Sequence, residues 1–294
     1  MLNLLRADLY RITRVRGLRG TFWQYLIVLA VFILLDNATW WISQIIDPST
    51  NIVPITIEYE TTSVFALRLL GFGMPTLVIA CSFGALEILF GDLSSGFLKN
   101  AVSSTRGRLA VFAEKILLVG IWSLMMMLAG IVIVILEQIA IVLTINTSSV
   151  VFTEPPLQFA LWALGTWLIV WALALIPYFF ALATRKKIPS YIFAALTAVP
   201  FFHTFLLAIA SSPNVLTFLD PIKPFLLDLA TWSPGFAIVI LSTPDLAHAT
   251  LSSFSPLGLP SDYTSLLVLT IMIGIVWIVA SGALFLLVAR KKDL

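Results

Sequence analysis

Few side chains in this chain of 294 residues could take part in chemistry. The two histidines, His203 and His248, lie far apart in the sequence, and the single cysteine is Cys81. A zinc site needs several such ligands in one place, and no His-Glu-x-x-His, Gly-x-Ser-x-Gly or phosphate-binding loop motif occurs. The sequence therefore predicts no metal ligand and no catalytic residue, and any ATP would have to be held by another chain.

The elements that carry these residues are apolar throughout. The chain is 60% hydrophobic and 11% charged, with a mean hydropathy of +1.04, whereas a soluble domain is about 25% charged. A helix needs about 20 apolar residues to cross a membrane, and windows of that order recur along the chain. We therefore expect one all-α polytopic membrane domain. The six predicted spans are residues 22–42, 69–90, 116–138, 159–183, 188–210 and 265–289.

Basic residues gather on one side of this topology. They precede the first span, separate spans two and three, separate spans four and five, and follow span six, which leaves Arg68 and Lys223 for the other side. Positive residues remain in the cytoplasm, so both termini are predicted to be cytoplasmic.

Residues 1–19 are predicted to form an amphipathic helix in the inner membrane interface, because apolar residues recur there at three- and four-residue steps. These residues are Leu2, Leu5, Leu9 and Ile12.

Residues 211–264 are predicted to form a long outer loop between spans five and six. Within it, the apolar stretch 229–244 is short and contains Pro234 and Gly235. Counting it as a crossing would also place the basic C-terminus outside. We expect a re-entrant or interfacial segment there, since freed backbone groups can be satisfied by protein or water.

Ionisable residues inside the spans are costly and must face protein or water. Asp36 in span one, Glu137 at the outer end of span three and His203 in span five are candidates for a cargo path. Structural hydrogen bonds or interfacial positions are the favoured alternative for each of them. Glu87, near the inner end of span two, is expected to form a structural ion pair. Its possible partners are Arg106, Arg108 and Lys115.

The cytoplasmic segment 91–110, between spans two and three, is the most informative part of the sequence. Gly91 is predicted to end the membrane helix, and Asp92 or Ser94 to cap a new short helix. The tip of that helix would present Phe97, Leu98 and Lys99. An apolar tip flanked by polar groups favours docking into a groove on a partner.

This segment resembles the coupling segment in permease subunits of ABC transporters of the type-2 exporter family, which includes antibiotic, bacteriocin and lantibiotic efflux systems. The close match covers residues 83–115, and the six-span layout agrees over the whole chain. The residues that match the family pattern, with Leu98 inside it, are Asp92, Gly96, Phe97, Lys99, Asn100, Arg106 and Lys115.

The resemblance implies a dimer of identical or similar subunits in the bacterial plasma membrane, bound to two ATPase subunits that receive the coupling helices. ATP and Mg²⁺ would be held by the ATPase, and no nucleic acid is expected as a partner. A hydrophobic or amphipathic cargo, such as an antimicrobial peptide or a drug, would be moved outward. Two other classes stay open: a polytopic membrane enzyme acting on lipid, and an ion-coupled secondary carrier.

Overall fold

The described part of the chain is helical, apart from short turns and one parallel pair of three-residue strands. The structure is a computed structural model that describes residues 2–14, 20–46, 57–59, 61–71, 75–96, 108–145, 150–152, 155–211, 217–242 and 262–291. The elements are α1 (Leu2–Thr13), α2 (Thr21–Ile46), β1 (Ile57–Tyr59), α3 (Thr61–Leu70), α4 (Thr76–Ser94), α6 (Arg108–Ile145), β2 (Val150–Phe152), α7 (Pro156–Thr184), α8 (Lys187–Ala198), α9 (Phe201–Ser211), η2 (Thr217–Ile222), α10 (Lys223–Thr231), α11 (Pro234–Ser242) and α13 (Tyr263–Lys291).

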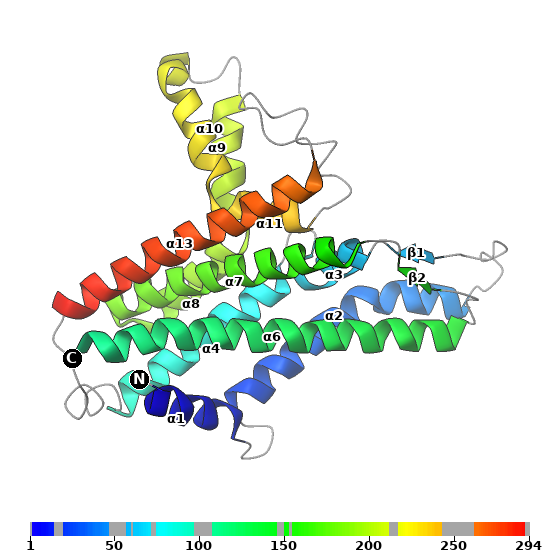
Figure 1. The fold of residues 1–294 in the computed structure, drawn as a ribbon, viewed down its shortest axis with the longest axis horizontal. Coiled ribbons are helices and arrows are strands. Elements are labelled where there is room, and N and C mark those ends of the chain that lie inside the picture. The colour runs from blue at the N-terminus through cyan, green and yellow to red at the C-terminus, as the bar shows by residue number, and fades with distance from the viewer. Residues whose placement is uncertain are drawn as a thin grey trace.

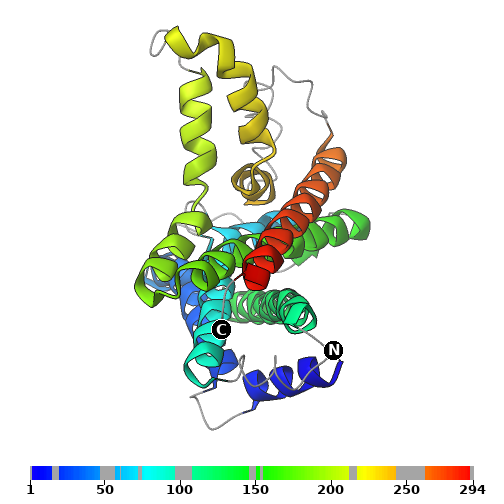
Figure 2. The same cartoon turned by 90° about the vertical axis from the view of Figure 1, so that its left-hand side faces the viewer.

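The long helices α6, α7 and α13 run side by side and form the body of the molecule (Figures 1 and 2). Helix α13 lies along α7, and α4 packs against α2, α6, α7 and α8. One end of this bundle carries α1, the start of α6 and the end of α13, and both chain ends are marked there (Figure 1). We call it the basal end.

Several helices are long and apolar enough to cross a membrane. Within the described ranges four helices qualify alone, namely α4, α6, α7 and α13, and two bent helix pairs raise the number to as many as six. Large apolar side chains on their outer faces are exposed, such as Val279 at 64% and Leu136 at 59%. A soluble protein rarely shows such a surface. The expectation of a multi-pass helical membrane protein is therefore confirmed, and the six-span topology stays a prediction.

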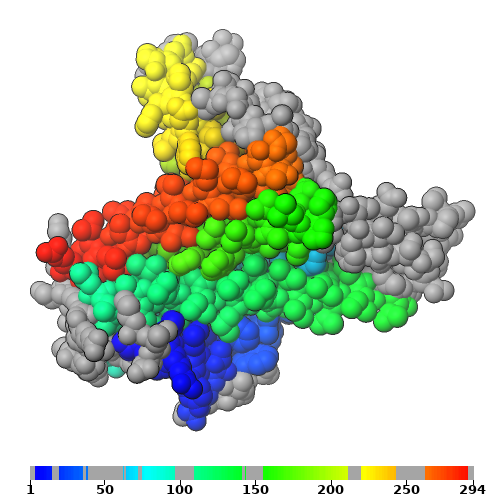
Figure 3. All heavy atoms as spheres, viewed as in Figure 1, coloured from blue at the N-terminus to red at the C-terminus, as the bar shows by residue number. Residues whose placement is uncertain are grey.

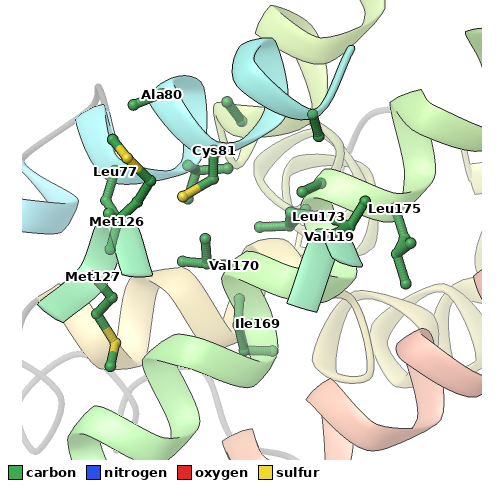
Figure 4. Close-up of a cluster of buried hydrophobic side chains, with 14 of the residues drawn as sticks. Leu77, Ala80, Cys81, Val119, Met126, Met127, Ile169, Val170, Leu173 and Leu175 are labelled. Atoms are coloured by element: carbon green, nitrogen blue, oxygen red, sulfur yellow. The ribbon is translucent and has the colours of Figure 1, made fainter. Parts of the chain in front are cut away.

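The interior of the bundle is apolar. Side chains from α4, α6 and α7 meet in one cluster that includes Cys81, Met126 and Val170 (Figure 4). Gly84 lets α4 approach α6, because a Cβ at this position would lie 2.3 Å from the ring of Trp122. The indole Nε1 of Trp122 donates a hydrogen bond to the carbonyl oxygen of Cys81 at 3.0 Å. The ring thus fills the interface and also satisfies its one polar group.

Tryptophan side chains join α7 to its neighbours in the same way. Trp171 donates to the carbonyl oxygen of Ile116 in α6 at 3.1 Å. Trp162 donates to the carbonyl oxygen of Leu241 in α11 at 2.9 Å. Because an unpaired N–H is costly away from water, these hydrogen bonds fix the relative positions of three helices.

The predicted straight span 188–210 is broken in the structure. Helices α8 and α9 are bent by 55° to each other. The cause is Pro200, because the residue before a proline avoids helical backbone angles. Val199 accordingly has an extended backbone, with φ −78° and ψ 137°.

The predicted outer loop 211–264 contains helices in its described part. Helix α10 packs along α9, and this hairpin stands out from the bundle (Figures 1 and 2), where it forms a projection in the space-filling view (Figure 3). Helix α11 bends away from α10 by 58° and packs against α7 and α13. With 9 residues, α11 is about 14 Å long and too short to cross a bilayer alone.

Candidate functional site

Five charged side chains from three helices meet at the basal end of the bundle. Helix α1 contributes two of them, the last turns of α4 one, and the first turns of α6 two. We call this group the basal ion cluster. Its members are Asp8, Arg11, Asp92, Glu114 and Lys115.

Lys115 lies at the centre of the cluster. Its Nζ is 2.8 Å from Oδ2 of Asp92 and 3.8 Å from Oε2 of Glu114, and it donates a hydrogen bond to Oδ2 of Asp8. The side chain of Lys115 is fully buried, as is that of Asp92. One ammonium group therefore ties α1, α4 and α6 together away from solvent.

Arg11 closes the cluster on its outer side. Its Nη2 donates to Oδ1 of Asp92 and lies 3.2 Å from Oδ1 of Asp8, one turn earlier in α1. The side chain is 42% exposed. Water can therefore reach this guanidinium, so Arg11 is the solvent-exposed member of the cluster.

The cluster holds one more acidic group than basic groups, since three carboxyl groups face two basic groups. Glu114 is 1% exposed, and neither of its carboxylate oxygens accepts a hydrogen bond from the described part of the chain. Tyr178 of α7 is also buried, and it lies within electrostatic range of Asp92, Glu114 and Asp8. Because an unpaired buried charge costs several kcal/mol, the removal of either cation would strain the whole site.

The predicted boundary at Gly91 is wrong. Helix α4 begins at Thr76, six residues beyond the end of α3, and continues through Gly91 and Asp92 to Ser94. Asp92 does not cap a new helix, because its carboxylate is inside α4 and paired with Lys115. The turn that ends α4 instead places Gly96 at φ +68°, a left-handed conformation that glycine adopts without steric cost.

The remaining residues predicted to couple to an ATPase lie outside the described residues. Their placement does not enter the description of the site. They are Phe97, Leu98, Lys99, Asn100 and Arg106.

Glu87 forms a structural ion pair as expected, but not with Lys115. Its Oε2 is 3.3 Å from Nζ of Lys187 and accepts a hydrogen bond of 2.5 Å from the hydroxyl of Tyr191. Both partners belong to α8, so Glu87 holds α8 against α4. Lys115 is instead paired with Asp8 and Asp92 in the basal ion cluster.

Two of the candidates for a cargo path, Glu137 and His203, have separate partners in the structure. Glu137 is buried in α6 with its Oε2 3.7 Å from Nε of Arg68 in α3, so it is not at an exposed boundary. His203 is buried in α9, with Nδ1 3.1 Å from the carbonyl oxygen of Ala230, as expected for a structural histidine. Asp36 belongs to α2, but its side chain lies outside the described residues.

The sequence did not single out Asp8, Arg11 or Glu114 as members of a site. One signal for Asp8 was present, since it is the only acid in α1 and falls on the apolar side of that helix, four residues before the buried Ile12. An acid on an apolar face must find a partner. What the sequence alone lacks is the identity of that partner.

Among the described residues, no group of three or more histidine, cysteine, aspartate or glutamate side chains could hold a metal ion.

No model of a known protein family matches the chain, and no curated protein matches it with significant similarity.

Proposed function

We propose that this chain is the membrane-spanning permease subunit of an ATP-driven ABC exporter. Its sequence resembles that family in segment 83–115. Its four to six candidate spanning helices suit the role. In this proposal the chain crosses the bacterial plasma membrane six times, with the basal end in the cytoplasm.

The ion pair between Asp92 and Lys115 carries the proposal. These two residues belong to the stretch 83–115 that resembles the family, and their charged groups meet at 2.8 Å in a fully buried site. A force applied to the coupling segment would reach α4 and α6 together, because moving one helix without the other would break a buried ion pair. A mechanical connection of this kind is what transmission from an ATPase to membrane helices requires.

The proposal assigns the energy source and the partners to other chains. ATP and Mg²⁺ would bind to two ATPase subunits, and a second permease subunit would complete the pathway. The cargo would be hydrophobic or amphipathic, such as an antimicrobial peptide or a drug, since the spans carry few charges.

The direct test is the double variant Phe97→Ala with Lys99→Ala, assembled with its ATPase in proteoliposomes. We expect ATP hydrolysis to continue while cargo movement is lost, with normal insertion of the chain. The matched control is Phe201→Ala with Lys223→Ala on the projecting α9–α10 hairpin, which removes the same types of side chain at positions outside the coupling segment. Transport equal to wild type in the Phe97 and Lys99 variant would refute the coupling role.

An ion-coupled secondary carrier is the second candidate, and one observation favours it. Such carriers use broken helices, and the two helix breaks of this chain lie side by side: a Cβ on Gly235 would be 2.9 Å from Cβ of His203 and 3.3 Å from Cα of Pro200. Purification in mild detergent, followed by a transport assay, distinguishes the exporter from the carrier. A stoichiometric ATPase supports the exporter, whereas transport driven by an ion gradient without any ATPase supports the carrier.

A further inference from the structure

A cavity of about 290 Å³ lies beside the basal ion cluster. It is a partly open cavity lined by α1, the first turn of α2 and the last turns of α4. The coupling role proposed above makes no use of it. The residues that matter to its chemistry are Arg11, Ile12, Thr21, Glu87, Gly91 and Asp92.

The cavity offers one exposed group of each charge to a ligand, because the second carboxylate of its lining, that of Asp92, is buried and paired with Arg11. The side chain of Arg11 is 42% exposed and that of Glu87 is 41% exposed, so both remain accessible although each has protein partners. A guanidinium binds phosphate oxygens through charge-assisted hydrogen bonds, and a carboxylate accepts hydrogen bonds from a primary ammonium group. The lining therefore suits a small molecule that carries both a phosphate and an amine.

The size of the cavity suits a small group of a ligand. Small-molecule sites usually measure about 300 to 1,000 Å³, so 290 Å³ fits a group of about the size of a lipid headgroup. The apolar Ile12 and Ile88 complete its wall.

An exposed apolar stripe leads away from the cavity along α2. Thr21 lines the cavity, and Val28, Phe32 and Leu35 fall on the same side of the helix, because a residue advances by about 100° in an α-helix. These three side chains are 41%, 48% and 61% exposed. Acyl chains could follow this stripe from a headgroup bound in the cavity, which favours a lipid over a soluble phosphate ester.

We propose that this cavity binds the headgroup of a zwitterionic phospholipid with a primary amine, with its phosphate on Arg11 and its ammonium on Glu87. The lipid would join α1 to α2 and α4 at the membrane surface. The proposal does not depend on ATP-driven transport.

The test is native mass spectrometry of the delipidated full chain, titrated separately with phosphatidylethanolamine, phosphatidylcholine and phosphatidylglycerol. We expect about tenfold tighter binding of phosphatidylethanolamine than of the other two, because only its headgroup combines phosphate with a hydrogen-bonding ammonium. Equal affinity for the three lipids would overturn the proposal. So would displacement of the lipid by soluble phosphoethanolamine at equal concentration, since the ligand would then need no acyl chains.

Two cavity variants and one control complete the experiment. Glu87→Gln removes the charge but keeps an acceptor for Tyr191, and Gly91→Trp fills open space, because a Cβ at Gly91 meets no atom within 4 Å. Both should lose the tenfold preference while the thermal stability of the lipid-free protein is kept. Asp220→Asn, on an exposed carboxylate of the projecting hairpin, should retain the preference. Full selectivity in either cavity variant would overturn the proposal.

Discussion

Replacing Lys115 with methionine should release α1 from the bundle. Methionine keeps an unbranched side chain of similar reach, so the change removes the charge more than the volume. The carboxylates of Asp8 and Asp92 would then keep Arg11, which water already reaches, and Glu114 would lose the ammonium group of Lys115. Breaking a buried ion pair costs about 3 to 5 kcal/mol, so we take about 3 kcal/mol as the loss in the free energy that docks α1.

Hydrogen exchange measures this loss directly. Each 1.4 kcal/mol or so is a factor of ten in an equilibrium constant, so amides of residues 2–14 should exchange about 100-fold faster in the Lys115→Met protein. The matched control is Lys187→Met. The pair of Lys187 with Glu87 is exposed and worth at most about 1 kcal/mol, and it joins α8 to α4 without a residue of α1.

The reasoning would be refuted by equal exchange of α1 in the Lys115→Met and Lys187→Met proteins. Should Lys115→Met fail to insert into the membrane, Asp8→Asn provides a second test. It keeps the shape of the side chain while removing the negative charge that faces Lys115. Exchange in α1 should again rise by more than tenfold, because an amide cannot replace the carboxylate at a buried ammonium.

Three further substitutions test separate parts of the fold. Gly84→Leu forces a side chain onto Trp122 and should destabilise the protein by at least about 1 to 3 kcal/mol, which a thermal melt in detergent detects. Glu137→Leu removes the carboxylate that lies 3.7 Å from Nε of Arg68 and should cost about 3 kcal/mol, and adding Arg68→Leu should recover most of that loss in the same melt. Ser233→Ala removes the cap of α11 and should cost about 1 kcal/mol, seen as roughly fivefold faster amide exchange at the start of that helix.

The helices that depend on local pattern could be predicted from the sequence. Spans 159–183 and 265–289 lie within α7 and α13, because a run of apolar residues specifies a long helix in a membrane without help from the rest of the fold. The amphipathic helix predicted within residues 1–19 is also present, as α1. Its three- and four-residue spacing is a local property of the same kind.

The prediction of one unbroken helix over residues 188–210 is wrong, although the sequence contains a signal for the break between α8 and α9. A window that counts apolar residues does not detect a bend in the helix axis, so it predicts one continuous span over residues 188–210. Pro200 carried the signal, since a proline disfavours helical angles at the preceding residue. Val199 shows the expected extended backbone.

The partners in the basal ion cluster could not be predicted. Asp8 and Lys115 are 107 residues apart, and their pairing depends on how α1 crosses the start of α6. The boundary at Gly91 failed for a related reason. A glycine inside a helix costs about 1 kcal/mol. Breaking the buried ion pair of Asp92 with Lys115 would cost more, and this pair requires Asp92 to lie in the helix. The tertiary contact therefore outweighs the local preference of Gly91.

The burial of the cluster also determines which parts could move together. Separating α4 from α6 at their basal ends would break the buried ion pair of Lys115 with Asp92, at a cost of several kcal/mol. Moving both helices as one unit disturbs neither charge. Loss of the Arg11 contact costs less, because the guanidinium is partly solvated already. In the proposed exporter, an ATPase acting on the segment after α4 would therefore displace the basal ends of α4 and α6 jointly, and α1 would follow for as long as Asp8 remains paired with Lys115.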